Sequence, residues 1–380
     1  MRIADILKNK SSVTDGNTGS ATKENVVITK PTEEVDNDKM TRNVIPETSQ
    51  KFQIDNIIAK NTTIQIPKEV KVETADPIEA YTSLTNWIKN ILFNMTDYSV
   101  LHEDMIIEVL NKLVKLNSGK LLLIVNKSTT HNYLIGHSAN VCILALKFGR
   151  ELNYDQDKLL KLGAVALLHD IGMFKMLDIV NKPGKLSAEE YTEIKKHALL
   201  GKNIVENIDI TENFKKVLIP VVFQHHERKN GKGYPSGVKE ISEFAKIISL
   251  IDIYEALTHY RPYRERLLPH NALKFLIEQC NEFDTDLIKI LIKAMSLFPP
   301  GSFIKLNTGE IAKVVSVHSE FPTRPVVELF MDSQSNILSE KKIIDLSATP
   351  MVHISEAIDE LKLKVSKEVA FKLKSQLYWI

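Results

Sequence analysis

The sequence has few cysteines, no long apolar runs and no excess of charge of either sign. Its 380 residues include two cysteines, Cys142 and Cys280, and both lie in apolar, helix-like surroundings without a CxxC neighbour. We expect both thiols to be reduced and buried, and neither to ligate a metal. Lysine plus arginine number 49 against 48 aspartate plus glutamate. This balance argues against a general binding surface for nucleic acid polymers, so an anionic ligand must be met by local charge.

No apolar run is long enough to span a bilayer, and residues 1–6 lack the apolar core of a signal peptide. We therefore expect no membrane insertion and a cytoplasmic location. Residues 1–50 are rich in Lys, Thr, Asn, Asp, Glu and Ser. Such a segment cannot bury enough apolar surface to offset its ordering entropy. We predict a largely disordered arm over residues 1–75, in which short alternating patches within 52–75 favour a strand or two.

The most informative feature is the pair His169-Asp170, which ends the apolar run of residues 162–168. A buried carboxylate is costly unless it is paired or coordinated, and an adjacent neutral imidazole makes a metal-binding pair with it. A lone histidine in this position is more often a hydrogen-bonded core residue. The interpretation therefore depends on further ligands elsewhere in the chain.

Such ligands are present beside other apolar stretches. They are His137, His197, the doublet His225-His226, and Asp252. Together with His169 and Asp170 they give five histidines and two aspartates, which is more than one divalent ion requires. The set suits two octahedral ions with Asp170 as the bridge, and an imidazole-rich site bridged by carboxylate favours Fe or Mn over Ca or Mg. The alternative is seven hydrogen-bonded core residues.

With these residues the sequence resembles the HD-GYP domain, a branch of the HD phosphohydrolase superfamily. The resemblance covers about residues 126–296 and rests on several motifs that recur in order. They are His169-Asp170, Lys182-Pro183-Gly184-Lys185-Leu186, His225-His226-Glu227-Arg228, Gly231-Lys232-Gly233-Tyr234-Pro235, Ala256-Leu257-Thr258 and Arg261-Pro262-Tyr263-Arg264. The resemblance implies a helical metal-dependent phosphodiesterase that hydrolyses cyclic di-GMP to linear pGpG, or on to GMP, in bacterial second-messenger signalling.

The resemblance also implies how the ligands are shared. One ion would be held by His137, His169, Asp170 and Asp252, and the other by Asp170, His197, His225 and His226. Some family members hold a third metal through a glutamate one helical turn before the first histidine. Tyr133 stands at that position here, and a phenol is a poor substitute. We therefore predict two divalent ions, Fe or Mn.

Two further groups of residues are expected at the substrate. Gly233, Tyr234 and Pro235 form a loop in which glycine allows close approach to a ligand and Tyr234 can stack on, or bond to, a nucleotide. Arg261 and Arg264 suit phosphate or guanine, with structural ion pairs as the alternative. His131, His259, His270 and His318 have no such company and are interpreted as surface or loop histidines.

One departure from the family pattern bears on activity. The family usually has a lysine in His-Asp-x-x-Lys that is thought to face the scissile phosphate, and Met173 occupies that position here. Lys175, two residues on, is our candidate to supply the missing charge as a catalytic residue beside Asp170. If it does not, the chain is a catalytically weak or inactive module that binds a cyclic dinucleotide or a protein partner. A nucleotidase acting on another nucleotide is the weaker third alternative.

The pattern of apolar residues predicts a mainly α protein. An amphipathic pair of helices, from Pro77 and over Ser99–Leu116, forms a helical region over 76–125 suited to packing, regulation or dimerisation. The all-helical HD-type domain follows over 126–296, and its helix starting after Ser187 has a capping box with Glu190 and carries His197 near its end. A small β appendage over 297–350, with a hairpin turn at 307–310, and a C-terminal helix over 351–380 complete the chain. A homodimer and a signalling protein partner are left open.

Overall fold

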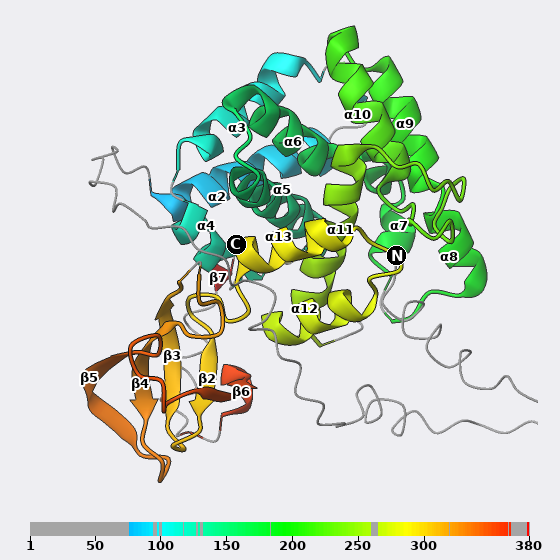
Figure 1. Cartoon of the computed structure of the whole chain (residues 1–380). Helices are drawn as coiled ribbons and strands as arrows, with labels where there is room; N and C mark the ends of the chain where they lie inside the picture. Colours follow the sequence, from blue (N-terminus) through cyan, green and yellow to red (C-terminus); the bar gives the residue numbers. More distant parts are fainter. Residues whose placement is uncertain are drawn as a thin grey trace, which may run out of the picture. The chain divides into compact units, whose positions relative to one another are not determined.

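The computed structural model describes residues 76–93, 97–98, 101–116, 118–126, 128–129, 132–182, 184–259, 265–318, 320–363, 365 and 378–379. The arm predicted over residues 1–75, with its strands, lies outside the described residues. The described part is mainly helical with one small antiparallel sheet near the C-terminus, as predicted (Figure 1).

The helices are α2 (Pro77–Trp87), α3 (Glu103–Val114), α4 (Ser118–Val125), α5 (Tyr133–Glu151), α6 (Gln156–Leu168), α7 (Leu177–Val180), α8 (Ala188–Ile194), α9 (His197–Asn207), α10 (Glu212–Gln224), α11 (Glu243–Thr258), α12 (Pro269–Glu278) and α13 (Thr285–Met295). A π-helical turn, η3 (Ile88–Phe93), extends α2, and a 3-10 turn, η5 (Ile171–Lys175), follows α6.

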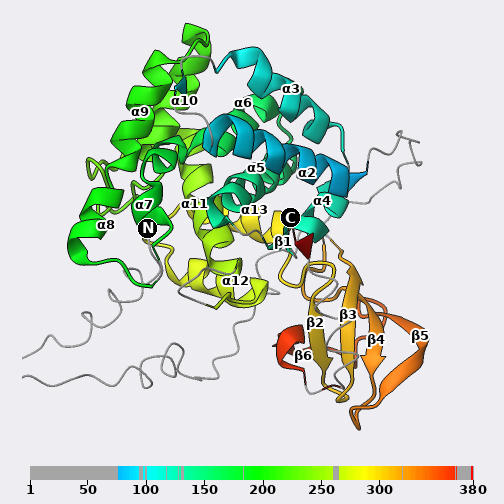
Figure 2. The same ribbon diagram turned by 180° about the vertical axis from the view of Figure 1, so that it is seen from behind.

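Helix α5 lies at the centre of the helical part. It packs against α2, α4, α6, α11 and α13, and Figures 1 and 2 show these helices around it from opposite sides. Its sequence is apolar on nearly every side, and most of its residues are buried. Burying each of Leu134, Ile143 and Leu144 stabilises the fold by about 1.5–3 kcal/mol. A helix that is buried on all sides can hold a polar side chain rigidly in the interior.

Side-chain caps define where the helices start. The carboxylate of Asp76 accepts a hydrogen bond from the Ile78 amide ahead of α2, and Asp155 accepts one from the Lys158 amide ahead of α6. Ser187 and Glu190 form the predicted capping box at the start of α8. Each cap satisfies amides that have no partner within the helix and contributes about 1 kcal/mol.

The C-terminal β unit is a five-stranded antiparallel sheet with the order β5-β4-β3-β2-β6. Its strands are β2 (Phe303–Leu306), β3 (Ile311–Ser316), β4 (Val326–Met331), β5 (Ile337–Asp345) and β6 (Ile354–Ile358). The predicted strands and the hairpin turn between β2 and β3 are confirmed. Alternate residues of β4 are buried, which places one face of the sheet on the core of the unit. A two-residue bridge also pairs β1 (Ser128–Thr129) with β7 (Tyr378–Trp379) in parallel.

The helix predicted over 351–380 is wrong at its start. Residues Ile354–Ile358 form β6, which pairs with β2 so that Phe303 faces Ile358. The apolar spacing of Ile354 and Ile358 fits a helix, but β2 has a free edge whose backbone groups need partners. Pairing with that edge decides the conformation of this short segment. Strand β5 was also missed, because its charged residues interrupt the apolar alternation.

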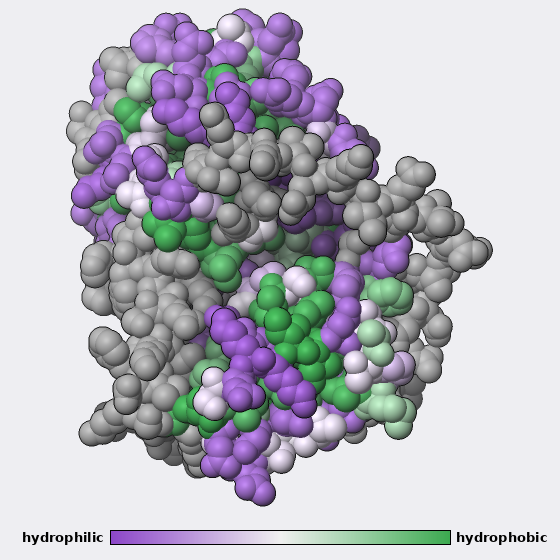
Figure 3. All heavy atoms as spheres, turned by 90° about the vertical axis from the view of Figure 1, so that its left-hand side faces the viewer, coloured by the Kyte–Doolittle hydropathy of each residue, from purple (hydrophilic) through white to green (hydrophobic). Residues whose placement is uncertain are grey.

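The surface of the β unit carries exposed apolar side chains. The lower part of Figure 3 shows hydrophobic residues gathered there, and among the large apolar residues of the unit Val315 is 44%, Phe321 52% and Ile343 61% exposed.

Among the described helices, none combines the length and the apolar character needed to cross a bilayer.

Candidate metal centre

Five elements bring the seven predicted ligands together. His137 lies on α5 and Asp252 on α11, while His169 and Asp170 follow directly after the last turn of α6. His197 is the first residue of α9, and the doublet His225-His226 follows α10. All seven side chains are buried; they are His137, His169, Asp170, His197, His225, His226 and Asp252. We call them the histidine–aspartate cluster. The prediction that His197 lies near the end of the helix starting after Ser187 is wrong, because α8 ends at Ile194 and a turn precedes α9.

The cluster consists of two adjoining groups. Ligand atoms of Asp170, His197, His225 and His226 lie within 4.8 Å of one another, and so do those of His137, His169 and Asp252. Asp170 faces both groups. Its Oδ1 is 3.3 Å from Nε2 of His197 and of His225, and its Oδ2 is 3.6 Å from Nε2 of His137 and of His169. A carboxylate placed in this way suits a bridge between two ions.

Backbone carbonyls orient three of the imidazoles. Nδ1 of His169 is 2.7 Å from the Ala166 carbonyl oxygen, and Nδ1 of His197 is 2.7 Å from that of Ile194. Nδ1 of His225 is 3.0 Å from the Val222 carbonyl oxygen. A carbonyl only accepts, so each Nδ1 carries the hydrogen and Nε2 turns toward the cluster. This is the arrangement that fixes the tautomer of metal-ligating histidines.

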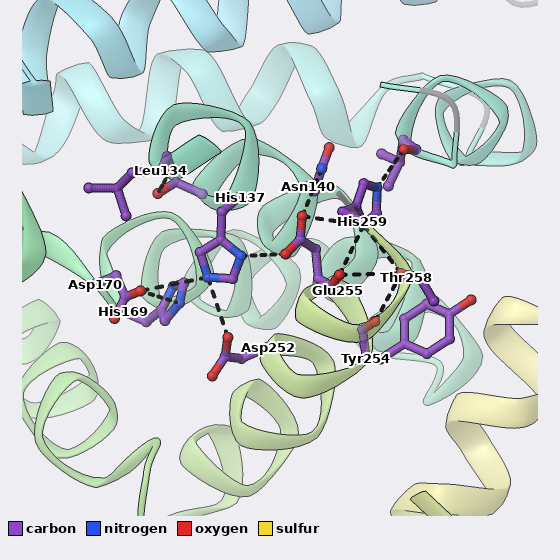
Figure 4. Close-up of polar contacts among 12 residues, drawn as sticks. Leu134, His137, Asn140, His169, Asp170, Asp252, Tyr254, Glu255, Thr258 and His259 are labelled. Carbon is purple, nitrogen blue, oxygen red and sulfur yellow. Dashed lines mark hydrogen bonds and ion pairs between the residues drawn. The ribbon is translucent and has the colours of Figure 1, made fainter. Parts of the chain in front are cut away.

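His137 is oriented by a carboxylate instead. Its Nδ1 lies 2.5 Å from Oε2 of Glu255, and its Nε2 lies 3.3 Å from Oδ1 of Asp252 (Figure 4). Burial alone would lower the pKa of His137, but the charge of Glu255 and hydrogen bonds to Asp170 and Asp252 raise it well above its usual value. A metal ion bound beside Nε2 would replace the proton held there.

Three other histidines and both aspartates of the cluster have shifted pKa values. Burial lowers the pKa of His169, brings that of His197 to about 4 and holds that of His226 well below its usual value. Burial would raise the pKa values of Asp170 and Asp252, but neighbouring histidines outweigh it and hold both below the usual range. At neutral pH His169, His197 and His226 are therefore neutral imidazoles, and Asp170 and Asp252 are ionised carboxylates.

Several polar atoms of the cluster have no hydrogen-bond partner. They are Nε2 of His169, Oδ1 of Asp170, and both ring nitrogens of His226. In addition, Nε2 of His197 faces Nε2 of His225 at 3.3 Å. Unpartnered buried nitrogens and oxygens are costly, and bound cations would satisfy Nε2 of His169, Oδ1 of Asp170 and one ring nitrogen of His226. The residues therefore fit divalent metal ions, and seven ordinary core residues would not leave this pattern.

A close backbone contact fixes one half of the cluster against the other. A Cβ added at Gly172, in η5, would lie 2.1 Å from the carbonyl oxygen of His197 and 2.8 Å from the amide nitrogen of Gly201. Only glycine allows η5 and α9 to approach this closely. The segment that carries Asp170 is thereby held directly against the first turn of the helix that carries His197.

The predicted Gly-Tyr-Pro loop packs on the histidine doublet. A Cβ added at Gly233 would lie 2.4 Å from Cα of Glu227, so this glycine is required by close approach of two backbones. Glu227 is buried, and its Oε1 accepts hydrogen bonds from the amides of Ser236 and Gly237. Sequence reasoning missed this role of Glu227, although its place directly after His226 pointed to it.

Tyr234 contacts the cluster directly. Its ring stacks on His226 with centroids 4.6 Å apart and planes 26° apart, and its amide donates to the His226 carbonyl. The side chain is 9% exposed, burial raises the pKa of its hydroxyl well above the usual value, and that hydroxyl has no hydrogen-bond partner. A nucleotide at this loop would therefore contact a tyrosine ring that already packs on His226, one of the proposed metal ligands.

Of the three cationic side chains predicted to contact the substrate, the structure describes Lys175. Arg261 and Arg264 lie outside the described residues. Lys175 is exposed at the end of η5, and its Nζ lies 4.5 Å from the centroid of the Tyr98 ring. Met173, which replaces the family lysine, is half-buried.

Two interpretations of single residues are wrong. His259 is 8% exposed rather than a surface residue, because its Nε2 bonds to the Val125 carbonyl and its Nδ1 lies 3.3 Å from Glu255. Its position four residues after Glu255, directly after the last residue of α11, was the available signal. Cys280 is exposed, whereas Cys142 is buried as expected. Cys280 follows the end of α12, where the apolar periodicity no longer predicts burial.

Comparison with known families identifies the helical part. Residues 124–287 match the HD domain, and residues 303–366 match the KOW domain associated with HD domain. The metal-binding cluster lies within the first match. Residues 124–287 are therefore similar to HD domains, as the predicted resemblance to the HD-GYP branch of the HD superfamily implied.

Three relatives illustrate the similarity. A cyclic di-GMP phosphodiesterase of Pseudomonas aeruginosa is 29% identical over 248 residues, covering 64% of this chain and 59% of that protein. One of Borreliella burgdorferi is 30% identical over 218 residues, covering 56% and 55%. A 3'3'-cGAMP-specific phosphodiesterase of Vibrio cholerae is 34% identical over 171 residues, covering 44% and 36%. The chain thus spans less than two thirds of the length of each.

Among solved structures, an HDG"Y"P protein from Bdellovibrio bacteriovorus has a TM-score of 0.45 and 21% identity, covering 57% of this chain and 70% of that one.

Proposed function

We propose that this chain is a metal-dependent phosphodiesterase that hydrolyses cyclic di-GMP. The observation that carries the proposal is the gathering of seven buried ligands into two adjoining groups, with Asp170 of one group facing His137 and His169 of the other. Relatives named cyclic di-GMP phosphodiesterases support the choice of substrate. The proposal assigns the same reaction class to this chain.

The proposed centre holds two divalent ions, Fe or Mn. His137, His169, Asp170 and Asp252 would hold one, and Asp170, His197, His225 and His226 the other, with Asp170 as the bridge. Five imidazoles favour Fe or Mn over Mg or Ca. When bound, such ions neutralise charge on a phosphate and increase the acidity of a water molecule.

The protein's own residues would prepare this centre for a phosphodiester. Burial keeps His169 and His197 unprotonated, neighbouring histidines keep Asp170 and Asp252 ionised, and the contact between η5 and α9 fixes the spacing of Asp170 and His197. Hydrolysis adds water across one P–O3′ bond and leaves a 5′-phosphate and a free 3′-hydroxyl on linear pGpG. A second cycle on the linear product would give GMP.

Substrate contacts are proposed for three segments. The loop of Gly233, Tyr234 and Pro235 lies directly against the doublet, so a phosphate at the cluster would meet it. Lys175, together with Arg261 and Arg264, would neutralise the phosphates and bind guanine. A homodimer, a signalling protein partner and a cytoplasmic location remain predictions from the sequence.

A specific observation favours a second candidate, a module that binds the cyclic dinucleotide or a protein without turnover. Met173 replaces the family lysine, and the ammonium of Lys175 lies over Tyr98. In this case the cluster would be retained for binding alone.

The deciding experiment is anaerobic incubation of Mn(II)- or Fe(II)-loaded protein with cyclic di-GMP, with products separated by chromatography. We expect linear pGpG or GMP, and we expect Asp170→Ala to abolish it. Asp178→Ala, at an exposed aspartate on α7, is the matched control and should keep full activity. A parallel incubation with 3'3'-cGAMP tests the other substrate named among the relatives. Intact substrate with fully metal-loaded protein would favour the binding module instead.

A further inference from the structure

A chain of three hydrogen bonds runs from α2 to the histidine–aspartate cluster. The Tyr81 hydroxyl donates to Oδ1 of Asn140 at 2.8 Å, and Nδ2 of Asn140 donates to Oε1 of Glu255 at 2.9 Å. The other carboxylate oxygen of Glu255 lies 2.5 Å from Nδ1 of His137. Figure 4 shows His137 between Glu255 on one side and Asp170 and Asp252 on the other. All four members of the chain are buried, with exposed fractions of 0–4%.

The chemistry of these groups gives the chain one direction. A carboxylate only accepts hydrogen bonds, so Glu255 requires the NH₂ end of Asn140 and a hydrogen on Nδ1 of His137. The Tyr81 hydroxyl satisfies the amide oxygen and so opposes a flip that would point this oxygen at Glu255. Once Nδ1 of His137 carries the hydrogen, Nε2 is the atom available to a metal. Nε2 is also the atom that faces Asp252 and Asp170.

A second buried contact reaches the same carboxylate from α4. Nε2 of His259 lies 2.7 Å from the carbonyl oxygen of Val125, the last residue of α4, and Nδ1 of His259 lies 3.3 Å from Oε1 of Glu255. The Glu255 carboxylate is therefore bonded directly by Asn140 and His137 of α5, while Tyr81 of α2 acts on it through Asn140.

We propose that Tyr81 and Asn140 are positioning residues of the metal centre, which hold Glu255 so that His137 presents Nε2 to the ion. This inference rests on the proposed metal centre, and it assigns part of that centre to α2. Tyr81 precedes residues 124–287, which match the HD domain. The helix before the domain thus completes the ligand geometry inside it.

The test is a set of matched variants titrated with Mn(II), with free Mn(II) followed by electron paramagnetic resonance. Glu255→Gln should weaken Mn(II) binding about 10- to 100-fold, as expected for the partner of a ligating histidine. Tyr81→Phe keeps the ring and removes one hydrogen bond, and should weaken binding about two- to tenfold. Thr85→Val is the control. Thr85 is also buried on α2, but its hydroxyl bonds to the carbonyls of Tyr81 and Thr82 within α2, so binding should stay within about twofold of wild type.

A double variant separates positioning from general packing. If Tyr81 acts through Glu255, the effect of Tyr81→Phe on Mn(II) affinity should vanish in the Glu255→Gln background. A purely structural role would instead lower the unfolding temperature of chelator-treated protein and leave the two effects on affinity additive. Circular dichroism of every variant checks that it is folded.

The outcomes distinguish this inference from the proposed activity. Additive effects, or wild-type Mn(II) affinity in Tyr81→Phe and Glu255→Gln, would overturn the positioning role while leaving turnover untouched. Protein that shows the predicted pattern of Mn(II) affinities but leaves cyclic di-GMP intact would overturn the proposed function alone. Wild-type protein that binds no Mn(II) would overturn both.

Discussion

Replacing Gly172 by alanine tests whether contact between η5 and α9 sets the geometry of the cluster. The added Cβ would lie 2.1 Å from the His197 carbonyl oxygen. Real Cβ atoms essentially never approach closer than 3.0 Å, so the two backbones must separate by about 0.9 Å, the difference between these values. The atom that must move belongs to His197 itself, and it cannot rotate away as a flexible side chain can.

The expected magnitudes follow from this displacement. Overpacking of this kind costs about 1–3 kcal/mol of stability, which corresponds to a decrease of about 2–10 °C in unfolding temperature. A misplacement near 1 Å at a reacting centre costs about 100-fold in rate. We therefore expect Gly172→Ala to fold, to bind less Mn(II) in the group that contains His197, and to lose about 100-fold in hydrolysis of cyclic di-GMP.

The assays are metal content by mass spectrometry, Mn(II) titration and chromatographic turnover. Gly149→Ala is the matched control, because its added Cβ would meet side-chain carbons of Leu159, Leu162 and Tyr154, at 2.8, 2.9 and 3.3 Å, and no backbone atom of the ligand segments. It should keep its metal and its activity. Wild-type metal content and turnover in Gly172→Ala would refute the reasoning that this contact fixes the ligands.

Three further predictions concern the charge, metal and ring at the site. Met173→Lys should raise turnover if the missing lysine limits the reaction, whereas unchanged kinetics would show that Lys175 or the metal charge suffices. Removing metal with a chelator should lower the unfolding temperature by about 5–10 °C, because an ion at 100 times its Kd contributes about 2.7 kcal/mol of stability. Calorimetry with and without Mn(II) measures this shift, and identical unfolding curves would contradict a buried metal centre. Tyr234→Phe should keep the Mn(II) affinity because its ring still stacks on His226, whereas Tyr234→Ala should lower it. Equal Mn(II) affinities of these two variants would show that the ring does not help to hold His226.

The ligands could be predicted from the sequence because each stands beside an apolar segment that must be buried. A buried histidine or aspartate needs a hydrogen-bond partner or a metal ion. Seven such residues can satisfy this need together if they lie in one cluster. His169-Asp170 and His225-His226 gave the strongest signal, since each pair puts two donors at the end of one helix.

The supporting residues could not be predicted in the same way. Glu255 and Asn140 are residue types that occur in any helix, so the local sequence does not mark them. Their hydrogen bonds form only because α2, α5 and α11 pack together. The same limit explains β6, because the pairing of Ile354–Ile358 with β2 depends on an edge about 50 residues earlier in the chain. Local periodicity contains no information about such distant partners.

The contact of Gly233 with Glu227 has a consequence for protein engineering. The loop and the histidine doublet touch through their backbones, and so a loop transplanted from a relative would carry its own spacing into the ligand set. Libraries that aim to change the accepted nucleotide should therefore leave residues 225–237 intact. Diversity belongs at side chains that border the centre without touching it, such as the half-buried Lys195, whose Nζ lies 5.2 Å from the centroid of the Tyr234 ring.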